Sequence, residues 1–187
     1  MKCFIFFLLC VALTQADFLS PTLKDDDPVE QTQQIFNGFW AEANLTEPTD
    51  LAQTCFGYNT SQLFINTLKE ALADLAVNNV VKALKAANAF FNQAPPEVHT
   101  CMNDSPYAKE AYEAYGVANL TVAQMSSRVG TYIITHLEKV HQEVVNANND
   151  IQAGNYFQFG QDGGKFALEV FNSSSLVDSS FTYNVKI

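Results

Sequence analysis

Two histidines in one helical stretch are the first residues whose types and spacing could do chemistry. His136 and His141 are five residues apart, which places them about 140° apart around a helix axis. A zinc hydrolase of the HExxH type needs two histidines one turn apart, and that sequence is absent. The spacing therefore predicts two partly exposed helical histidines rather than metal ligands.

A second pair of residue types could form a thiol nucleophile. His99 precedes Cys101 by two residues, and a catalytic cysteine needs a neighbouring base to activate its sulfur. This chemistry requires that Cys101 be a free thiol. The compartment in which the protein matures therefore decides the matter.

Two polar segments share part of the pattern of ligand-binding loops. Residues 160–166 contain three glycines and Lys165, but the glycine spacing differs from that of a phosphate loop and Phe166 replaces Ser or Thr. Residues 146–150 alternate oxygen-bearing side chains as calcium loops do, yet Ile151 stands where that loop requires glycine. Neither segment predicts a ligand.

Carboxylates offer a further class of chemistry, because glycoside hydrolysis uses two acids that meet in space rather than in sequence. No spacing favours any of the available acids Glu97, Asp104, Glu110 and Glu113, and no G-x-S-x-G sequence indicates a serine hydrolase. The sequence predicts no catalytic residue, no metal site and no cofactor, so we do not expect an enzyme.

The first 16 residues have the pattern of a cleaved signal peptide. Lys2 is followed by an apolar run over residues 3–13, and Thr14 and Ala16 place small side chains where signal peptidase cleaves. That run is too short for a membrane-spanning helix, which needs about 20 residues. We expect a mature chain over residues 17–187, located outside the cell or in the lumen of a secretory granule, with no membrane span after cleavage.

Secretion changes the interpretation of the cysteines. The leader removes two of the four, and Cys55 and Cys101 remain. Two cysteines in an oxidising compartment allow one internal disulfide, with free thiols or an intermolecular bridge as the alternatives. The expected disulfide makes a Cys–His nucleophile implausible.

Secretion also gives meaning to five Asn-X-Ser/Thr triplets, each of them a weak signal alone. The candidate N-glycosylation sites are Asn44, Asn59, Asn103, Asn119 and Asn172. Most of them fall at the boundaries of predicted elements, where a glycan could be exposed.

The charge of the chain limits its partners. Twenty Asp and Glu face ten Lys and Arg, for a formal charge of −10, and loss of Lys2 with the leader makes the protein more acidic still. An acidic chain repels phosphate backbones, so nucleic acid is not an expected partner. The expected partner is an unidentified protein or a small apolar ligand.

Apolar residues at helical spacing predict an all-α domain that positions these residues. Asp27 is suited to cap the first helix and Pro28 to begin it. We expect a single-domain antiparallel bundle of about five main helices with one disulfide. The predicted main helices cover residues 28–43, 61–77, 80–91 and 121–146, and a last one runs from Ile151 or Asn155 to Phe171. Shorter helices are expected at 51–56, 97–102 and 106–115, with a turn at 57–60 and an extended or disordered tail at 172–187.

Two glycines in the last predicted helix have the spacing of a packing surface. Gly160 and Gly164 are one turn apart and present a flat strip where another backbone can approach. Tight helix packing is expected there rather than a ligand loop.

The leader, two cysteines ahead of helices, a long Val/Ile-striped helix and the segment at residues 154–160, GNYFQFG, resemble small secreted helical proteins of ciliated protozoa. This resemblance implies no activity. Three hypotheses follow: a secreted non-enzymatic protein with a protein-interaction or extracellular or granule-content role, a carrier of an apolar, lipid-like ligand in a cavity between helices, and an extracellular hydrolase without a recognisable motif.

Overall fold

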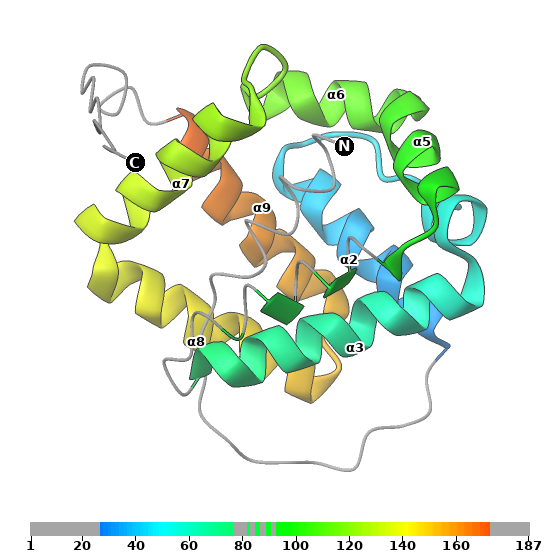
Figure 1. Ribbon diagram of the computed structural model, residues 1–187, viewed down its shortest axis with the longest axis horizontal. Helices are drawn as coiled ribbons and strands as arrows, with labels where there is room; N and C mark the ends of the chain where they lie inside the picture. Colours follow the sequence, from blue (N-terminus) through cyan, green and yellow to red (C-terminus); the bar gives the residue numbers. More distant parts are fainter. Residues whose placement is uncertain (1–26, 77–81, 83–84, 87–88, 91–92, 173–187) are drawn as a thin grey trace, which may run out of the picture.

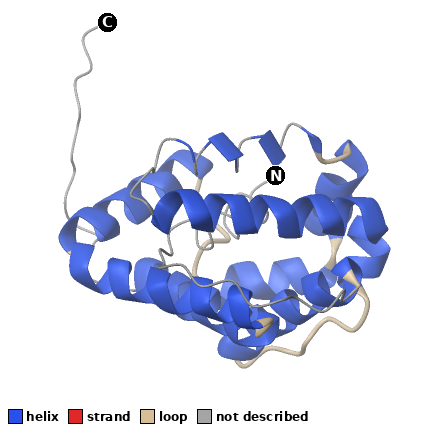
Figure 2. Ribbon diagram, turned by 90° about the horizontal axis from the view of Figure 1, so that it is seen from below, coloured by secondary structure: helices blue, strands red, loops and turns tan. Residues whose placement is uncertain are grey.

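The computed structural model describes residues 27–76, 82, 85–86, 89–90 and 93–172. Within these ranges the chain is helical and contains no strand (Figure 2). They contain a π-helical turn, η1 (Ala52–Phe56), and the α-helices α2 (Pro28–Glu42), α3 (Gly57–Ala76), α5 (Pro96–Asp104), α6 (Pro106–Ala114), α7 (Val122–Thr135), α8 (Leu137–Ala153) and α9 (Tyr156–Asn172). The all-α prediction is confirmed, and the described part contains seven α-helices rather than about five.

The first and last described helices form the centre of the fold. In Figure 1, α2 and α9 lie in the middle of the molecule and α3, α5, α6, α7 and α8 surround them. Asp27 caps α2 as expected, because its side chain accepts a hydrogen bond from the Val29 N–H at 2.9 Å. The aromatic side chains of α2 fill the centre, with Phe36 and Trp40 almost completely buried.

Glycines allow α2 and α9 to come into backbone contact. A Cβ atom on Gly160 would overlap the carbonyl oxygen of Ile35, and Gly38 lies equally close to the backbone of α9. Ile35 faces Gly160 and Phe39 faces Gly164, so the two helices advance in the same direction. This pair differs from the expected antiparallel arrangement, because the helices are far apart in the sequence and no short loop joins them.

The single long helix expected over residues 121–146 is wrong, because the chain bends at His136, where φ is −132° and ψ is 38°. The Thr135 hydroxyl donates to the carbonyl oxygen of Thr131 at 2.8 Å and lies 2.8 Å from His136 Nδ1. A threonine that bonds back onto the preceding turn competes with the helical hydrogen bonds and bends the helix. Leu137, which directly follows the bend, is consequently exposed.

The turn expected over residues 57–60 is also wrong, since this segment is the first turn of α3. The π-helical turn η1 runs directly into α3 through Gly57, whose φ of 62° favours glycine. This continuous segment carries Cys55 towards α5. Cys55 and Cys101 are bonded with their Cα atoms 5.4 Å apart, which confirms the expected disulfide.

Some predictions fall on other parts of the chain. The leader at residues 1–16, most of the helix expected over 80–91, and residues 173–187 of the predicted tail lie outside the described residues.

Candidate functional site

The two histidines of the predicted long helix do not form a ligand pair. His136 stands at the corner between α7 and α8, where its ring stacks on Tyr132 with centroids 4.4 Å apart. His141 lies on α8 and is exposed. Among the described residues, no three His, Cys, Asp or Glu side chains are placed to hold a metal ion together.

The other residues that the sequence suggested for a functional site are bonded to another residue, lie inside helices or are spread over the surface. The sulfur of Cys101 is bonded to Cys55, so it offers no thiol. Residues 160–166 and 146–150 lie inside α9 and α8 rather than in loops. The four acids considered for glycoside chemistry, Glu97, Asp104, Glu110 and Glu113, are all exposed on α5 and α6.

The structure brings together a group of charged side chains that no sequence motif indicated. Glu169 of α9 accepts a hydrogen bond from the Tyr132 hydroxyl at 2.6 Å and forms an ion pair with Lys139 of α8 at 2.5 Å. Glu143, one turn beyond Lys139, forms an ion pair with the same lysine and is affected by the negative charge of Glu169. Three helices, α7, α8 and α9, therefore meet at one polar cluster.

Glu143 is the least compensated member of this cluster. Its two carboxylate oxygens are shielded from solvent and accept no hydrogen bond from the described residues. The nearest cation is Lys139, whose Nζ is 3.8 Å from Glu143 Oε1. Burial first, and then the negative charge of Glu169, raise the pKa of Glu143 to about 7.

Glu169 has the opposite balance. Its pKa lies below the ordinary range because the hydrogen bonds from Lys139 and Tyr132, together with nearby positive charge, outweigh the effect of its burial. Burial and the contact with Glu169 raise the pKa of Tyr132. Glu169 is thus the ionised member of the pair near neutral pH, and Glu143 is the member that takes up a proton.

A second acid pair lies farther along the same two helices. Asp150 of α8 faces Asp162 of α9, and burial and this neighbour raise the pKa of Asp150 to about 6, against the lowering effect of a hydrogen bond from Asn155. The Asn155 Nδ2 atom is 3.5 Å from Asp150 Oδ1. Gln158 donates to Asp162 Oδ1 at 3.1 Å.

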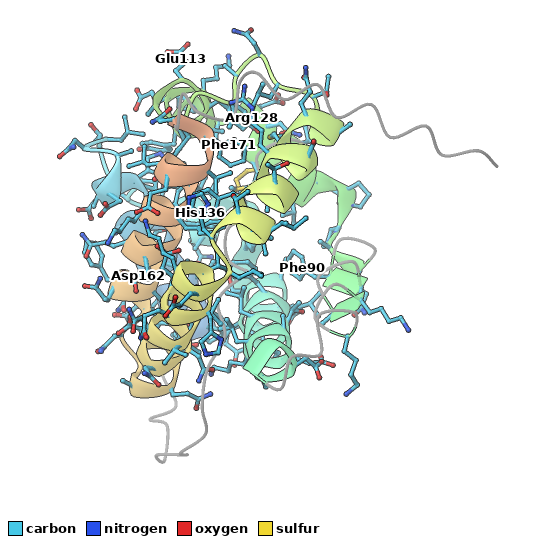
Figure 3. All side chains as sticks on the ribbon, turned by 90° about the vertical axis from the view of Figure 1, so that its left-hand side faces the viewer. Phe90, Glu113, Arg128, His136, Asp162 and Phe171 are labelled. Carbon is cyan, nitrogen blue, oxygen red and sulfur yellow. A yellow bond between two sulfur atoms is a disulfide. The ribbon has the colours of Figure 1, made fainter. Side chains whose placement is uncertain are left out.

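The two pairs are in register. Glu143 and Asp150 are seven residues apart on α8, and Asp162 and Glu169 are seven residues apart on α9. Seven residues are about two helical turns, so each helix presents its two acids on one side. Because α8 and α9 form an antiparallel hairpin, the acids meet pairwise along one line. We call these four residues, Glu143, Asp150, Asp162 and Glu169, the acid seam. Figure 3 labels one of them, Asp162 on α9, and also His136, which stands between α7 and α8.

The corner between α7 and α8 combines exposed apolar side chains with an open hollow. Ile134 and Leu137 are 73% and 64% exposed, and they are the most exposed large aliphatic side chains in the described part of the chain. A hollow of about 700 Å³ is lined by Leu137, His141 and their neighbours. A second hollow, of about 470 Å³, is bordered by Tyr132 and Glu169.

The chemistry available at these hollows is limited. Glu169 is held by both Tyr132 and Lys139, and the Glu143 oxygens are covered by protein. A general acid or base must reach the proton that it transfers, and Glu143 has no open path to a ligand in the 470 Å³ hollow, which it does not line. The cluster has the features of a structural polar network with one protonatable member.

The candidate glycosylation sites lie in different environments. Asn44, Asn59, Asn119 and Asn172 are exposed. Asn103 is half-buried, and its Oδ1 atom accepts a hydrogen bond from the Tyr112 hydroxyl at 3.3 Å.

Comparison with known proteins gives no relative: no protein-family model, no curated protein and no solved structure matches this chain. Within the described part of the chain, no helix is both long enough and apolar enough to cross a bilayer.

Proposed function

We propose that this chain is a secreted, non-enzymatic helical protein whose role is to bind another protein, either outside the cell or in the lumen of a secretory granule. The leader pattern at residues 1–16 supports export, and one disulfide is in keeping with an oxidising compartment. The five glycosylation triplets point in the same direction.

The observation that carries the binding role is the corner between α7 and α8. Ile134 and Leu137 are close in sequence on either side of the bend and are largely exposed. Exposed apolar side chains gathered beside a hollow, and bordered by polar groups, are typical of protein-binding surfaces. The bend at His136 produces this display, since a straight helix would continue the apolar stripe along the core.

Two further features support a binding protein over the alternatives. Most of the buried apolar side chains in the described part of the chain belong to one cluster, which includes Ile35, Phe36 and Phe171, while Ala71 and Ala86 form a small separate one. The two hollows at the α7–α8 corner are open to solvent and are bordered by charged groups, which offers little to an apolar ligand. The carboxylate nearest to one of them, Glu169, is already engaged by Lys139.

A site-specific cross-linker tests the proposal. We would replace Leu137 with a photoreactive benzoylphenylalanine in the secreted protein, and replace Phe157 as the control because it is an exposed aromatic residue (37%) on α9 outside every candidate glycosylation triplet. We expect a discrete protein adduct from position 137 that excess unmodified protein competes away and the Leu137→Asp variant does not. Equal adducts from both positions, or none from position 137, would contradict the proposal.

Export has its own test. The mature protein should begin at Asp17 and contain the intact disulfide, and mass spectrometry of the secreted protein measures both. A secreted protein that retains Met1 would contradict the leader assignment.

A further inference from the structure

The acid seam between α8 and α9 is unusual because like charges face each other twice across one helix pair. Two facing carboxylates repel when both are ionised and share a hydrogen bond when one carries a proton. Glu143 accepts no hydrogen bond from the described residues, and its one ion pair, with Lys139 at 3.8 Å, is shared with Glu169, which lies 2.5 Å from the same Nζ atom. The protonation state of these pairs therefore decides whether α8 and α9 attract or repel along this line.

We propose that the acid seam is a proton-dependent latch, which holds α8 against α9 while Glu143 and Asp150 carry protons and loosens α8 when these two acids ionise. Its two halves, Glu143 with Glu169 and Asp150 with Asp162, are spaced two turns apart and act on the same helix. The latch regulates the position of α8, and with it the corner that carries Leu137.

The charged and titratable groups that surround Glu143 come from α9, α8 and α7. From α9, Glu169 raises its pKa and Lys165 lowers it; on α8 itself, Lys139 lowers it. From α7, Tyr132 is committed to Glu169. The helix α3 also packs against α8, and its charged side chains do not contribute to the pKa of Glu143; these are Lys69, Glu70 and Asp74.

The direction of the pH effect follows from the raised pKa values. A carboxyl group whose pKa is higher in the folded protein than in the unfolded chain stabilises the fold below its ordinary pKa, and this stabilisation is lost as the pH rises through the folded value. For Asp150 and Glu143 those folded values are about 6 and about 7. The latch is therefore closed near pH 5 and open near pH 8.

This window matches a secreted protein that passes from an acidic lumen to neutral surroundings, where shifts between pH 5 and 8 serve as signals. In the lumen α8 would be held in place, and after release the corner between α7 and α8 would become free to adjust to a partner. This consequence for binding rests on the proposed function. The latch itself does not.

Hydrogen exchange of the α8 amides tests the latch without any partner. We would measure the purified full chain from pH 5 to pH 8, corrected for the intrinsic rate of exchange, and compare it with the double variant Glu143→Gln, Asp150→Asn. Amide side chains imitate the protonated acids. The matched control is Glu138→Gln, because Glu138 is an exposed acid on the same helix.

We expect the opening constant of α8 in the unmodified protein to rise about tenfold from pH 5 to pH 8, the equivalent of one pKa unit after allowance for solvent screening. Glu138→Gln should show the same rise, and the double variant little or none. An equal rise in the double variant, or no rise in the unmodified protein, would overturn the latch.

A second measurement needs no variant and so does not depend on how a variant folds. The carbon-13 chemical shift of the Glu143 carboxyl group, followed by NMR, should change with a midpoint above pH 6. A midpoint near the ordinary value for glutamate would overturn the proposal. If the latch is confirmed while cross-linking from position 137 fails, the proposed binding role is wrong and the latch stands. If cross-linking succeeds and hydrogen exchange of α8 is independent of pH, the latch is wrong and the proposed binding role stands.

Discussion

Single residues in this protein are distinguished by what surrounds them rather than by the motif to which they belong. Asn103 and Asn59 carry the same triplet signal, yet Asn103 is half-buried and accepts a hydrogen bond from Tyr112, whereas Asn59 is exposed in the first turn of α3. Asn103 is also two residues from the disulfide-bonded Cys101. A bulky glycan fits one setting and not the other.

We therefore predict unequal occupancy of the five triplets. Asn44, Asn59, Asn119 and Asn172 should carry glycans in the secreted protein, and Asn103 should remain unmodified. Glycopeptide mass spectrometry before and after glycosidase treatment measures each site. Full occupancy of Asn103 together with normal folding would show that burial does not govern modification here.

The acid seam shows how much a sequence can indicate at this scale. A spacing of seven between two acids is visible within α8 and again within α9, but such spacing is equally common on a solvated helix face. What the sequence lacks is the register between the two helices, which depends on tertiary packing and on the turn at Gly154. Glu143 and Glu169 could each be named from the sequence as acids, but not as a pair.

Among the helices, the strongest mutual constraint is between α2 and α9. The spacing of four between Gly160 and Gly164 predicted a helix-packing surface. Their partner Gly38 could not be predicted, because no sequence pattern indicates that the first and last described helices pack in parallel. The bend at His136 was missed for a related reason. The apolar spacing continues through the bend, and the back-bonded Thr135 hydroxyl, which favours a bend, has no distinctive signal in the sequence.

The close approach of α2 and α9 predicts a large difference between two Gly→Ala substitutions. Gly160→Ala should lower the free energy of unfolding by about 2 kcal/mol or more, because its Cβ would overlap the backbone of Ile35 and overpacking outweighs the better helix propensity of alanine. Gly130→Ala is the matched control. A Cβ there meets nothing within 4 Å, so stability should rise by roughly 0.5–1 kcal/mol.

Urea unfolding followed by circular dichroism measures both variants. Similar unfolding midpoints for Gly160→Ala and Gly130→Ala would mean that α2 and α9 are not in backbone contact.

At the scale of the whole molecule, one covalent bond joins η1, which packs against the central helix α2, to the peripheral helix α5. The disulfide ties η1 to α5 and closes a loop between positions 46 apart. The expected compartment and the cysteine count were sufficient to predict this bond, because the predicted loss of the leader would leave a single possible internal pair. The surrounding arrangement of helices was not predictable, since it depends on side-chain packing far from either cysteine.

Removing the disulfide should cost about 4 kcal/mol in the chain-entropy view. The double variant Cys55→Ala, Cys101→Ala should then unfold on the order of 8–16 °C lower than the parent protein, given about 2–4 °C per kcal/mol for a chain of this size. Differential scanning calorimetry measures this shift. The variant should melt at the same temperature with and without reductant, and a shift below about 2 °C in the variant would argue against the bond as a stabilising element.

The parallel contact between α2 and α9 also sets an order of events on the ribosome. Gly38 emerges roughly 120 residues before Gly160, so at about 5–20 residues per second the partner of α2 arrives roughly 6–24 s later. During that interval Phe36, Phe39 and Trp40, which α9 and its neighbours later bury, have no completed core to enter. The centre of the fold therefore cannot assemble until α9 has emerged, and nascent chains should depend on chaperones during this interval.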